Sequence, residues 1–172
     1  DIVTSRAPFE LPPDEPMRKR LITAEPPASK SLGGQWLPLD DIADVEISSE
    51  DADHPIESAL SPSASPGWRA AAPGQQTIRL LFAQPRQLHR IRLCFVETTA
   101  PRTQEYLLRW SADGQSFREI VRQQWNFSPH GSTSETEEHR VDLAGVKVLE
   151  LAITPDIGND QALASLAEMR LA

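Results

Sequence analysis

The stretch YLLRWSADGQSFREI, residues 106–120, places short segments with alternating apolar residues on either side of an Asp-Gly pair. The apolar residues before this pair recur at every second position: Tyr106, Leu108 and Trp110. This is the period of a β-strand with one buried face. Gly114 can adopt a positive φ and Asp113 can accept hydrogen bonds from nearby backbone, so the pair suits a tight turn closed by a glycine bulge. The stretch therefore predicts a hairpin that serves as scaffold.

Segments of the same kind follow one another toward the end of the chain: 77–82, 88–96, 104–110, 116–127, 139–143, 146–154 and 165–172. Pro, Gly, Asp and Asn separate them, and no long helical period intervenes, which is typical of an antiparallel sandwich. The alternation predicts these core residues: Ile91, Leu93, Phe95, Leu149, Leu151, Ile153, Leu166, Met169 and Leu171. Residues 45–48 predict another strand, and residues 54–60 a single-turn helix with an early proline.

The length of 172 residues allows one domain and an appendage. Prolines are dense up to about residue 39, so residues 1–40 are predicted to be an irregular proline-rich arm and residues 41–172 the domain. Residues 17–22, MRKRLI, are the exception, because they can form an edge strand. A solvated arm is the alternative.

Composition excludes several classes of function. The net charge of −8 opposes attraction to nucleic acid or to anionic lipid surfaces. No apolar run approaches the roughly 20 residues of a membrane-spanning helix. Cys94 is the only cysteine, so an internal disulfide and thiolate metal clusters are excluded. The histidines lack metal-ligand spacing and no nucleophile motif occurs, which argues against an enzyme; a pair of glycosidase carboxylates is the catalytic alternative.

Several stretches carry a resemblance to a known family: residues 43–60, the Gly67-Trp68 pair, residues 77–93, residues 106–117 and the terminal ASLAEMRLA, residues 164–172. Together they resemble the discoidin family, also called the coagulation-factor-type C domain, within the galactose-binding-like β-sandwiches. The resemblance implies an all-β, eight-stranded jelly-roll with binding loops at the end opposite the chain termini. It also implies a non-catalytic module, because relatives mostly bind carbohydrate and others bind lipid head groups or proteins.

The resemblance further implies either no cofactor or a structural calcium ion. Relatives hold calcium through a loop after the short helix, where an Asp-Gly pair is common, and through a Glu in the last strand. Glu168 matches the second element. The first is missing, because Leu60 is followed by Ser61-Pro62-Ser63.

Candidate ligand-binding residues lie on the expected loops. Arg102 can bind hydroxyls or a carboxylate through its forked guanidinium, or it can form a salt bridge with Glu97 or Glu105. Glu105 is itself a candidate. Trp125 can stack on a sugar ring, with the alternative that it packs in the core, and His130 follows in a long polar loop. Trp68 is expected to pack in the core, and His54 is expected to be solvated.

These observations predict a carbohydrate-binding module that recognises a neutral or acidic sugar or glycoconjugate through loops near Arg102 and residues 125–137. The alternative is a protein interaction or adhesion domain that uses the same rim or the proline-rich arm. No nucleic-acid partner and no transmembrane segment are expected.

Overall fold

The computed structural model describes residues 35–61 and 66–172. Most of the predicted arm, including the MRKRLI segment, lies outside the described residues. Three residues near the end of the predicted arm, Trp36, Leu37 and Leu39, contact the domain. The N–H of Leu37 donates to the carbonyl of Leu171 at 2.7 Å, and Trp36 lies under the guanidinium of Arg90 with 3.9 Å between Cζ and the ring centroid. Leu39 is buried.

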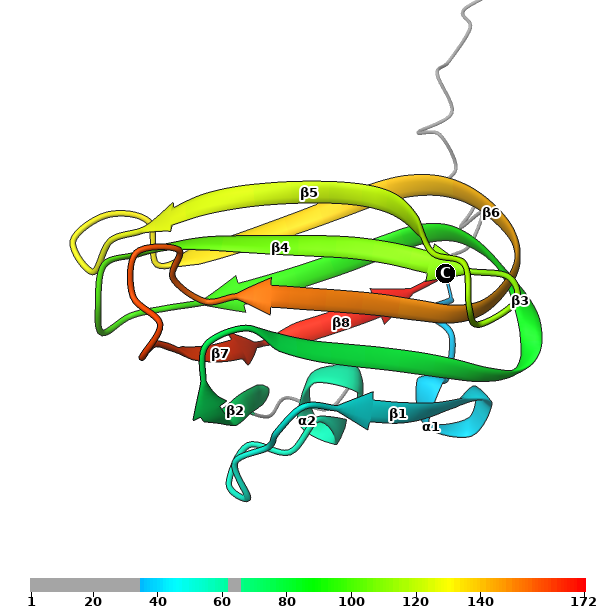
Figure 1. Cartoon of the computed structure of the whole chain (residues 1–172), viewed down its shortest axis with the longest axis horizontal. Coiled ribbons are helices and arrows are strands. Elements are labelled where there is room, and N and C mark those ends of the chain that lie inside the picture. Colours follow the sequence, from blue (N-terminus) through cyan, green and yellow to red (C-terminus); the bar gives the residue numbers. More distant parts are fainter. Residues whose placement is uncertain (1–34, 62–65) are drawn as a thin grey trace, which may run out of the picture.

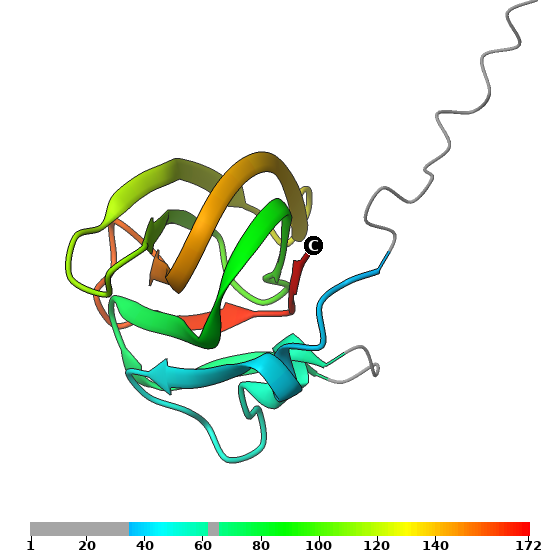
Figure 2. The ribbon, with the colours of Figure 1, turned by 90° about the vertical axis from the view of Figure 1, so that its right-hand side faces the viewer.

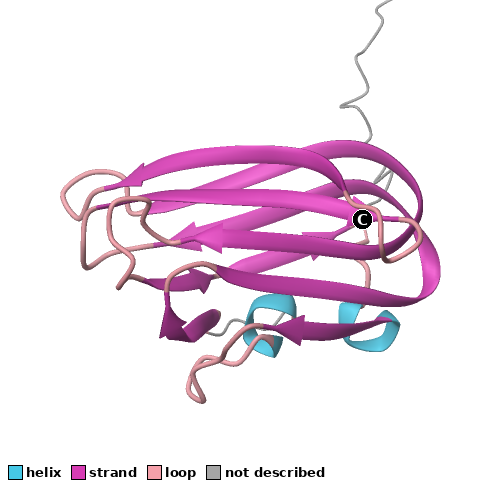
Figure 3. Ribbon diagram, in the orientation of Figure 1, coloured by secondary structure: helices cyan, strands magenta, loops and turns pink. Residues whose placement is uncertain are grey.

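Strands make up almost all of the regular structure (Figure 3). The elements, in chain order, are α1 (Leu39–Ile42), β1 (Ala43–Ile47), α2 (Glu57–Leu60), β2 (Trp68–Pro73), β3 (Gln76–Val96), β4 (Arg102–Ser111), β5 (Arg118–Phe127), β6 (Ser134–Thr154), β7 (Leu163–Leu166) and β8 (Glu168–Leu171). The predicted all-β class and the predicted single-turn helix are both confirmed. In the described part of the chain, no helix is long and apolar enough to span a membrane.

The strands form an antiparallel sandwich in which β3 and β6 contribute to both layers (Figures 1 and 2). One layer has five strand segments in the order β1, the first half of β3, the second half of β6, β4 and β5. The other has three: the first half of β6, the second half of β3, and β8. A separate pair, β2 and β7, lies at one end.

The long strands correct the predicted boundaries. Residues 77–82 and 88–96 were expected to be separate strands, as were 139–143 and 146–154, but each pair is one continuous strand of 21 residues. The register of β3 against β6 shifts between Leu81 and Arg90, around Pro85, and Gly145 on β6 has a φ of 73°. Irregular pairing of this kind bends a strand without ending it. The turn signals in the sequence therefore mark bends.

The core lies where the alternation predicts. All nine residues predicted from alternate positions have 0% exposure. Tyr106 and Leu108 are also buried, while Trp110 is half-buried at the margin of the core. Burying each large apolar side chain contributes about 1.5–3 kcal/mol, so this set dominates the stability of the sandwich.

The 113–114 turn closes the β4–β5 hairpin as predicted. Gly114 has a φ of 81°. Asp113 Oδ1 accepts hydrogen bonds from the backbone N–H groups of Ser116 at 2.7 Å and Gln115 at 2.8 Å. These bonds lower the pKa of Asp113 to about 2. The turn is held by its own residues, and it lies at the end of the sandwich where the C-terminus is found (Figure 1).

The first half of β6 directs acidic side chains toward the interior. Glu135 and Glu137 stand opposite the buried Phe95 and Leu93 in the register, so they occupy the inward face. Next along this face, Nε2 of His139 lies 2.9 Å from the hydroxyl of Tyr106. Burial, and then a hydrogen bond with Glu137, raises the pKa of Glu135 to about 7. The folded protein therefore holds a proton there that the unfolded chain releases near pH 4.5.

This proton predicts a pH dependence of stability. Because the pKa is higher in the folded state, the free energy of unfolding should fall as the pH rises from about 4.5 to about 7 and then level off. Glu135→Gln should remove most of that fall and raise the free energy of unfolding at pH 8 by about 1 kcal/mol, allowing for solvent screening. Urea denaturation at pH 5, 6.5 and 8 would measure it. The outward-facing Glu138→Gln is the control, and identical pH profiles for the two variants would contradict the prediction.

Candidate binding pocket

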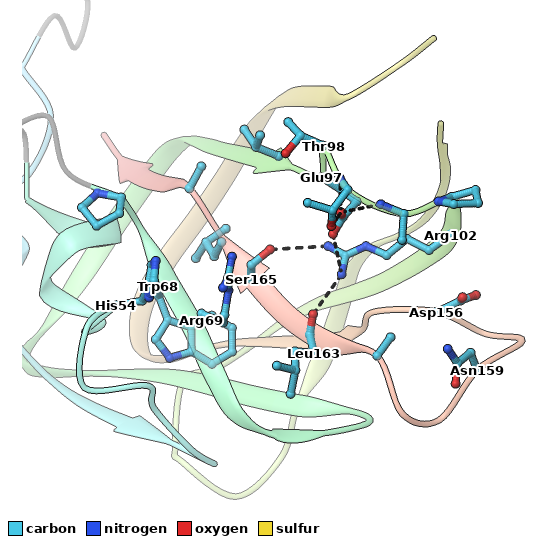
Figure 4. Close-up of a pocket in the computed structure, with 18 residues that line it drawn as sticks. His54, Trp68, Arg69, Glu97, Thr98, Arg102, Asp156, Asn159, Leu163 and Ser165 are labelled. Atoms are coloured by element: carbon cyan, nitrogen blue, oxygen red, sulfur yellow. Dashed lines mark hydrogen bonds and ion pairs between the residues drawn. The ribbon is translucent and has the colours of Figure 1, made fainter. Parts of the chain in front are cut away.

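A pocket of about 470 Å³ opens at the end of the sandwich opposite the C-terminus. It lies mainly between the β3–β4 loop (residues 97–101), the β6–β7 loop (residues 155–162) and parts of β2 and β7. His54, from the segment between β1 and α2, Val96 at the end of β3 and Arg102 at the start of β4 also line it. Figure 4 shows His54, Trp68 and Arg69 on one side and Arg102, Asp156 and Asn159 on the other. Antiparallel strand ends gather these segments, which lie far apart in the sequence.

Arg102, the first residue of β4, is the buried anchor of the pocket. Its side chain is 5% exposed, and its Nη1 lies 3.3 Å from Oε2 of Glu97. Nη1 also donates to the carbonyl of Leu163 at 2.9 Å, and Nη2 donates to Oγ of Ser165 at 3.4 Å. Burial lowers the pKa of Arg102, and the charge of Glu97 opposes that change. The guanidinium thus ties the β3–β4 loop to β7.

The Glu97 carboxylate is occupied by its own loop. Oε1 accepts hydrogen bonds from the Thr99 hydroxyl at 2.7 Å, the Thr99 N–H at 2.8 Å and the Ala100 N–H at 3.1 Å. Burial acts to raise the pKa of Glu97, but these bonds and the charge of Arg102 outweigh it, so the pKa is lowered. Glu97 is therefore ionised at neutral pH.

Asp156 holds the β6–β7 loop by accepting backbone hydrogen bonds, as Glu97 does in the β3–β4 loop. Its Oδ1 accepts from the N–H of Gly158 at 3.1 Å and from the N–H of Thr103 at 3.3 Å. The neighbouring Asn159 uses Oδ1 to accept from the N–H of Gln161 at 3.0 Å, which leaves its amide nitrogen available. The loop is thus held by short-range bonds and presents Asn159 at the rim.

On the opposite wall, Trp68 is buried at 1% exposure, as predicted for the core, and its Nε1 donates to the carbonyl of Ser49 at 3.2 Å. The next residue, Arg69, is exposed, and no hydrogen bond or ion pair holds its guanidinium among the residues that the structure describes. His54 lies beside them, with Nδ1 3.5 Å from Oδ2 of Asp51. This wall presents two nitrogen-bearing side chains, Arg69 and His54, in front of the buried Trp68.

The structure places the four predicted ligand-binding residues in different environments. Arg102 lines the pocket and also forms the expected salt bridge, with Glu97 as its partner. Glu105 lies on the outward face of β4, where it bonds Arg122 at 2.8 Å and Gln124 at 2.9 Å. Trp125 is half-buried against the core, and His130 is exposed in the β5–β6 loop. These last three do not line the pocket.

Sequence reasoning missed His54, Arg69, Asp156, Asn159 and Ser165 as pocket residues. The one local signal was the polar run PDIGND at residues 155–160, which ends a buried strand. The sequence alone does not indicate that residues 54 and 69 lie near that run. They approach it in the fold because β2 pairs with β7.

Glu168, the residue that the resemblance marks for calcium, does not line the pocket. It begins β8, and its two carboxylate oxygens each lie 3.7 Å from an arginine nitrogen, Nε of Arg92 and Nη2 of Arg170.

Known proteins resemble this chain in fold but not in sequence. No family model matches the chain, and no curated protein sequence matches it. Among solved structures, a pectin-binding carbohydrate-binding module is 16% identical, with a TM-score of 0.56 over 76% of this chain and 89% of that one. CpGH89CBM32-5 from Clostridium perfringens, in complex with GalNAc-β-1,3-galactose, is 18% identical, with a TM-score of 0.57 over 80% and 99%. The family 32 module of AlyQ, in complex with 4,5-unsaturated mannuronic acid, is 16% identical, with a TM-score of 0.57 over 77% and 95%. These likenesses establish the sandwich fold.

Proposed function

We propose that this chain is a non-catalytic carbohydrate-binding module that holds its sugar in the pocket between the β3–β4 loop, the β6–β7 loop and β2. The observation that carries the proposal is the pocket itself, a cavity of about 470 Å³ at the loop end with a buried, fully oriented arginine at its base. Support comes from similarly folded proteins described as sugar-binding modules.

The chemistry of the pocket suits a sugar, which presents hydroxyls on its edges and C–H groups on its faces. Side chains that can donate hydrogen bonds line the pocket, namely those of Arg69, Asn159 and His54. Apolar contact is available at the rim, because Val96 and Leu163 are 43% and 40% exposed and both line the pocket. A few fixed polar groups within an apolar rim are the usual composition of a small-ligand site.

The carboxylates favour binding over catalysis. A glycosidase needs a general acid whose pKa is raised, together with a second free carboxylate. Glu97 has a lowered pKa and bonds to Thr99, Ala100 and Arg102, while Asp156 holds the β6–β7 loop. Both are engaged in holding loops, which leaves neither free for proton transfer.

The exposed arginine of the pocket favours an acidic sugar. The lining holds two cations, Arg69 and Arg102, and two carboxylates, Glu97 and Asp156. Of these four side chains, that of Arg69 alone forms no hydrogen bond or ion pair in the described part of the chain. A uronic acid carboxylate would supply a partner through a forked, charge-assisted hydrogen bond. One of the similar structures is a module in complex with an unsaturated mannuronic acid, in line with this preference.

Calorimetry with sugars would test the proposal. Galactose, glucose and mannose should be compared with the matching uronic acids and with oligomers of each. We expect binding in the millimolar range or tighter, and His54→Ala should weaken it several-fold because a donor is lost. His130→Ala is the matched control, since His130 does not line the pocket. No heat with any sugar from folded protein, or equal loss in both histidine variants, would overturn the assignment.

The acidic preference has its own test. Arg69→Gln should weaken uronic acid binding by roughly tenfold while leaving the neutral sugar within about twofold, because only the charged hydrogen bond is lost. Arg118→Gln makes the same charge change at the β4–β5 hairpin, where Arg118 lies beside Trp110, and should alter neither. Equal loss for acidic and neutral sugars would show that Arg69 does not read the carboxylate.

The alternative function, a protein interaction domain, would be favoured by an exposed apolar patch away from the rim. Within residues 35–61 and 66–172, the exposed large apolar side chains are Val96, Ile157 and Leu163. Two of them line the pocket and the third belongs to the β6–β7 loop, so they support the pocket as the site of contact.

A further inference from the structure

Arg170 is a buried arginine on the last strand, β8, with an exposure of 8%. Its guanidinium reaches the chain just after α2. Nη1 donates to the carbonyl of Leu60 at 2.7 Å, and Nη2 donates to the carbonyl of Ser61. Nη2 also lies 3.7 Å from Oε2 of Glu168. One side chain thus joins two segments that are 110 residues apart in the sequence.

These groups stand where the resemblance places calcium, namely in the loop after the short helix and at a glutamate of the last strand. Calcium takes about six to eight oxygen ligands at roughly 2.3–2.6 Å. Here the carbonyls of Leu60 and Ser61 already accept hydrogen bonds from a cation, and Glu168 stands between Arg92 and Arg170. A guanidinium at the centre of the oxygens repels a second cation. Among the residues that the structure describes, these oxygens therefore do not fit a calcium ion.

We propose that the Arg170 guanidinium takes the place of the metal in this chain. The carbonyls at the end of a helix have no partner within the helix, and a cation is the charge that satisfies them. Arginine stays charged at any physiological pH and presents several donors in a rigid fork, so it can hold two carbonyls and face a carboxylate at once. Hydrogen bonds from a side chain of the protein, rather than an ion from solution, then fix the end of α2 to β8.

The contact of Arg170 with the end of α2 also positions one wall of the pocket. His54 precedes α2 and Trp68 follows it, and both line the pocket wall. Fixing the end of α2 against β8 therefore holds this wall in place. We expect the fold and the sugar site to be independent of calcium.

Thermal unfolding of the full chain would test this, with chelator, with millimolar calcium and with neither. We expect the three values of Tm to agree within about 1 °C. A calcium ion held at a hundred times its Kd would raise Tm by roughly 5–10 °C. A shift of that size, or calorimetric heat on titrating calcium into chelator-treated protein, would overturn the proposal.

Variants of Arg170 provide the second arm. Arg170→Ala should lower Tm by roughly 5–15 °C, because two buried carbonyls lose their donors. Arg170→Lys keeps the charge as a single point, so its loss should be smaller, and it serves as the readout if the alanine variant does not fold. Arg140→Ala, at an exposed position on β6, is the control and should shift Tm by less than about 2 °C. An unchanged Tm in both Arg170 variants would refute the role. Neither arm depends on sugar binding.

Discussion

Arg102→Met should lower the free energy of unfolding by about 3–5 kcal/mol and eliminate ligand binding. The side chains of Arg102 and Glu97 are only 5% and 14% exposed, so removing the arginine leaves a largely buried carboxylate without its cation. Breaking a buried pair from one side has an effect of this size. The carbonyl of Leu163 and the hydroxyl of Ser165 lose their donor at the same time.

Guanidinium chloride denaturation would measure the stability, and calorimetry with the best sugar would measure binding. Arg122→Met is the matched control, since Arg122 pairs with Glu105 at 2.8 Å on the exposed outer face of the sheet. An exposed pair contributes about 0–1 kcal/mol, so this variant should unfold nearly as the wild type does and bind equally well. Similar losses of stability in the two variants would show that burial does not make the Arg102–Glu97 pair more stabilising than the exposed pair.

Gly67→Ala should destabilise the protein by about 2–5 kcal/mol. Gly67 has a φ of 79°, and a Cβ there would lie 2.6 Å from the carbonyl oxygen of Leu166 and 2.8 Å from Cα of Ala167. Both are backbone atoms at the junction of β7 and β8, and they cannot move without disturbing the strands. The expected loss combines about 1–2 kcal/mol for the left-handed conformation with about 1–3 kcal/mol for the steric overlap.

Gly145→Ala separates these two contributions. Gly145 has a similar φ of 73°, but a Cβ there would meet no atom within 4 Å. Chemical denaturation of both variants should therefore show a loss of about 1–2 kcal/mol for Gly145→Ala and a clearly larger one for Gly67→Ala. Equal losses would mean that the β7–β8 junction can yield, and that the Gly67-Trp68 pair is not held by close packing.

The buried faces of the strands were predictable because they depend on a local property. Alternate residues of a strand point to opposite sides, so Ile91, Leu93 and Phe95 identify the interior without knowledge of the neighbouring strands. Turn chemistry, which is also local, placed the hairpin turn at Gly114. It went wrong at Pro85 and Gly145, because a proline or glycine marks an irregular backbone equally well at a bend and at a strand end.

The candidate binding pocket was predictable only in part. Arg102 was identified from its forked guanidinium on the loop of residues 97–105. It lines the pocket, and it also forms the salt bridge with Glu97 that was the alternative to ligand binding. Trp125 illustrates the opposite case. An aromatic beside a polar loop can face ligand or core, and only the pairing of Trp125 with Gln104 across β4 and β5 turns it inward.

The alternating pattern of apolar side chains was enough to establish an antiparallel sandwich, its interior and its principal turn, because each strand carries that information within a few residues. The tertiary structure alone decided that His54, Arg69, Arg102 and Asn159 share one pocket and that Arg170 grips the end of α2. Those contacts join residues separated by up to 110 positions, and the pairing of distant strands determines them rather than any local preference of the chain.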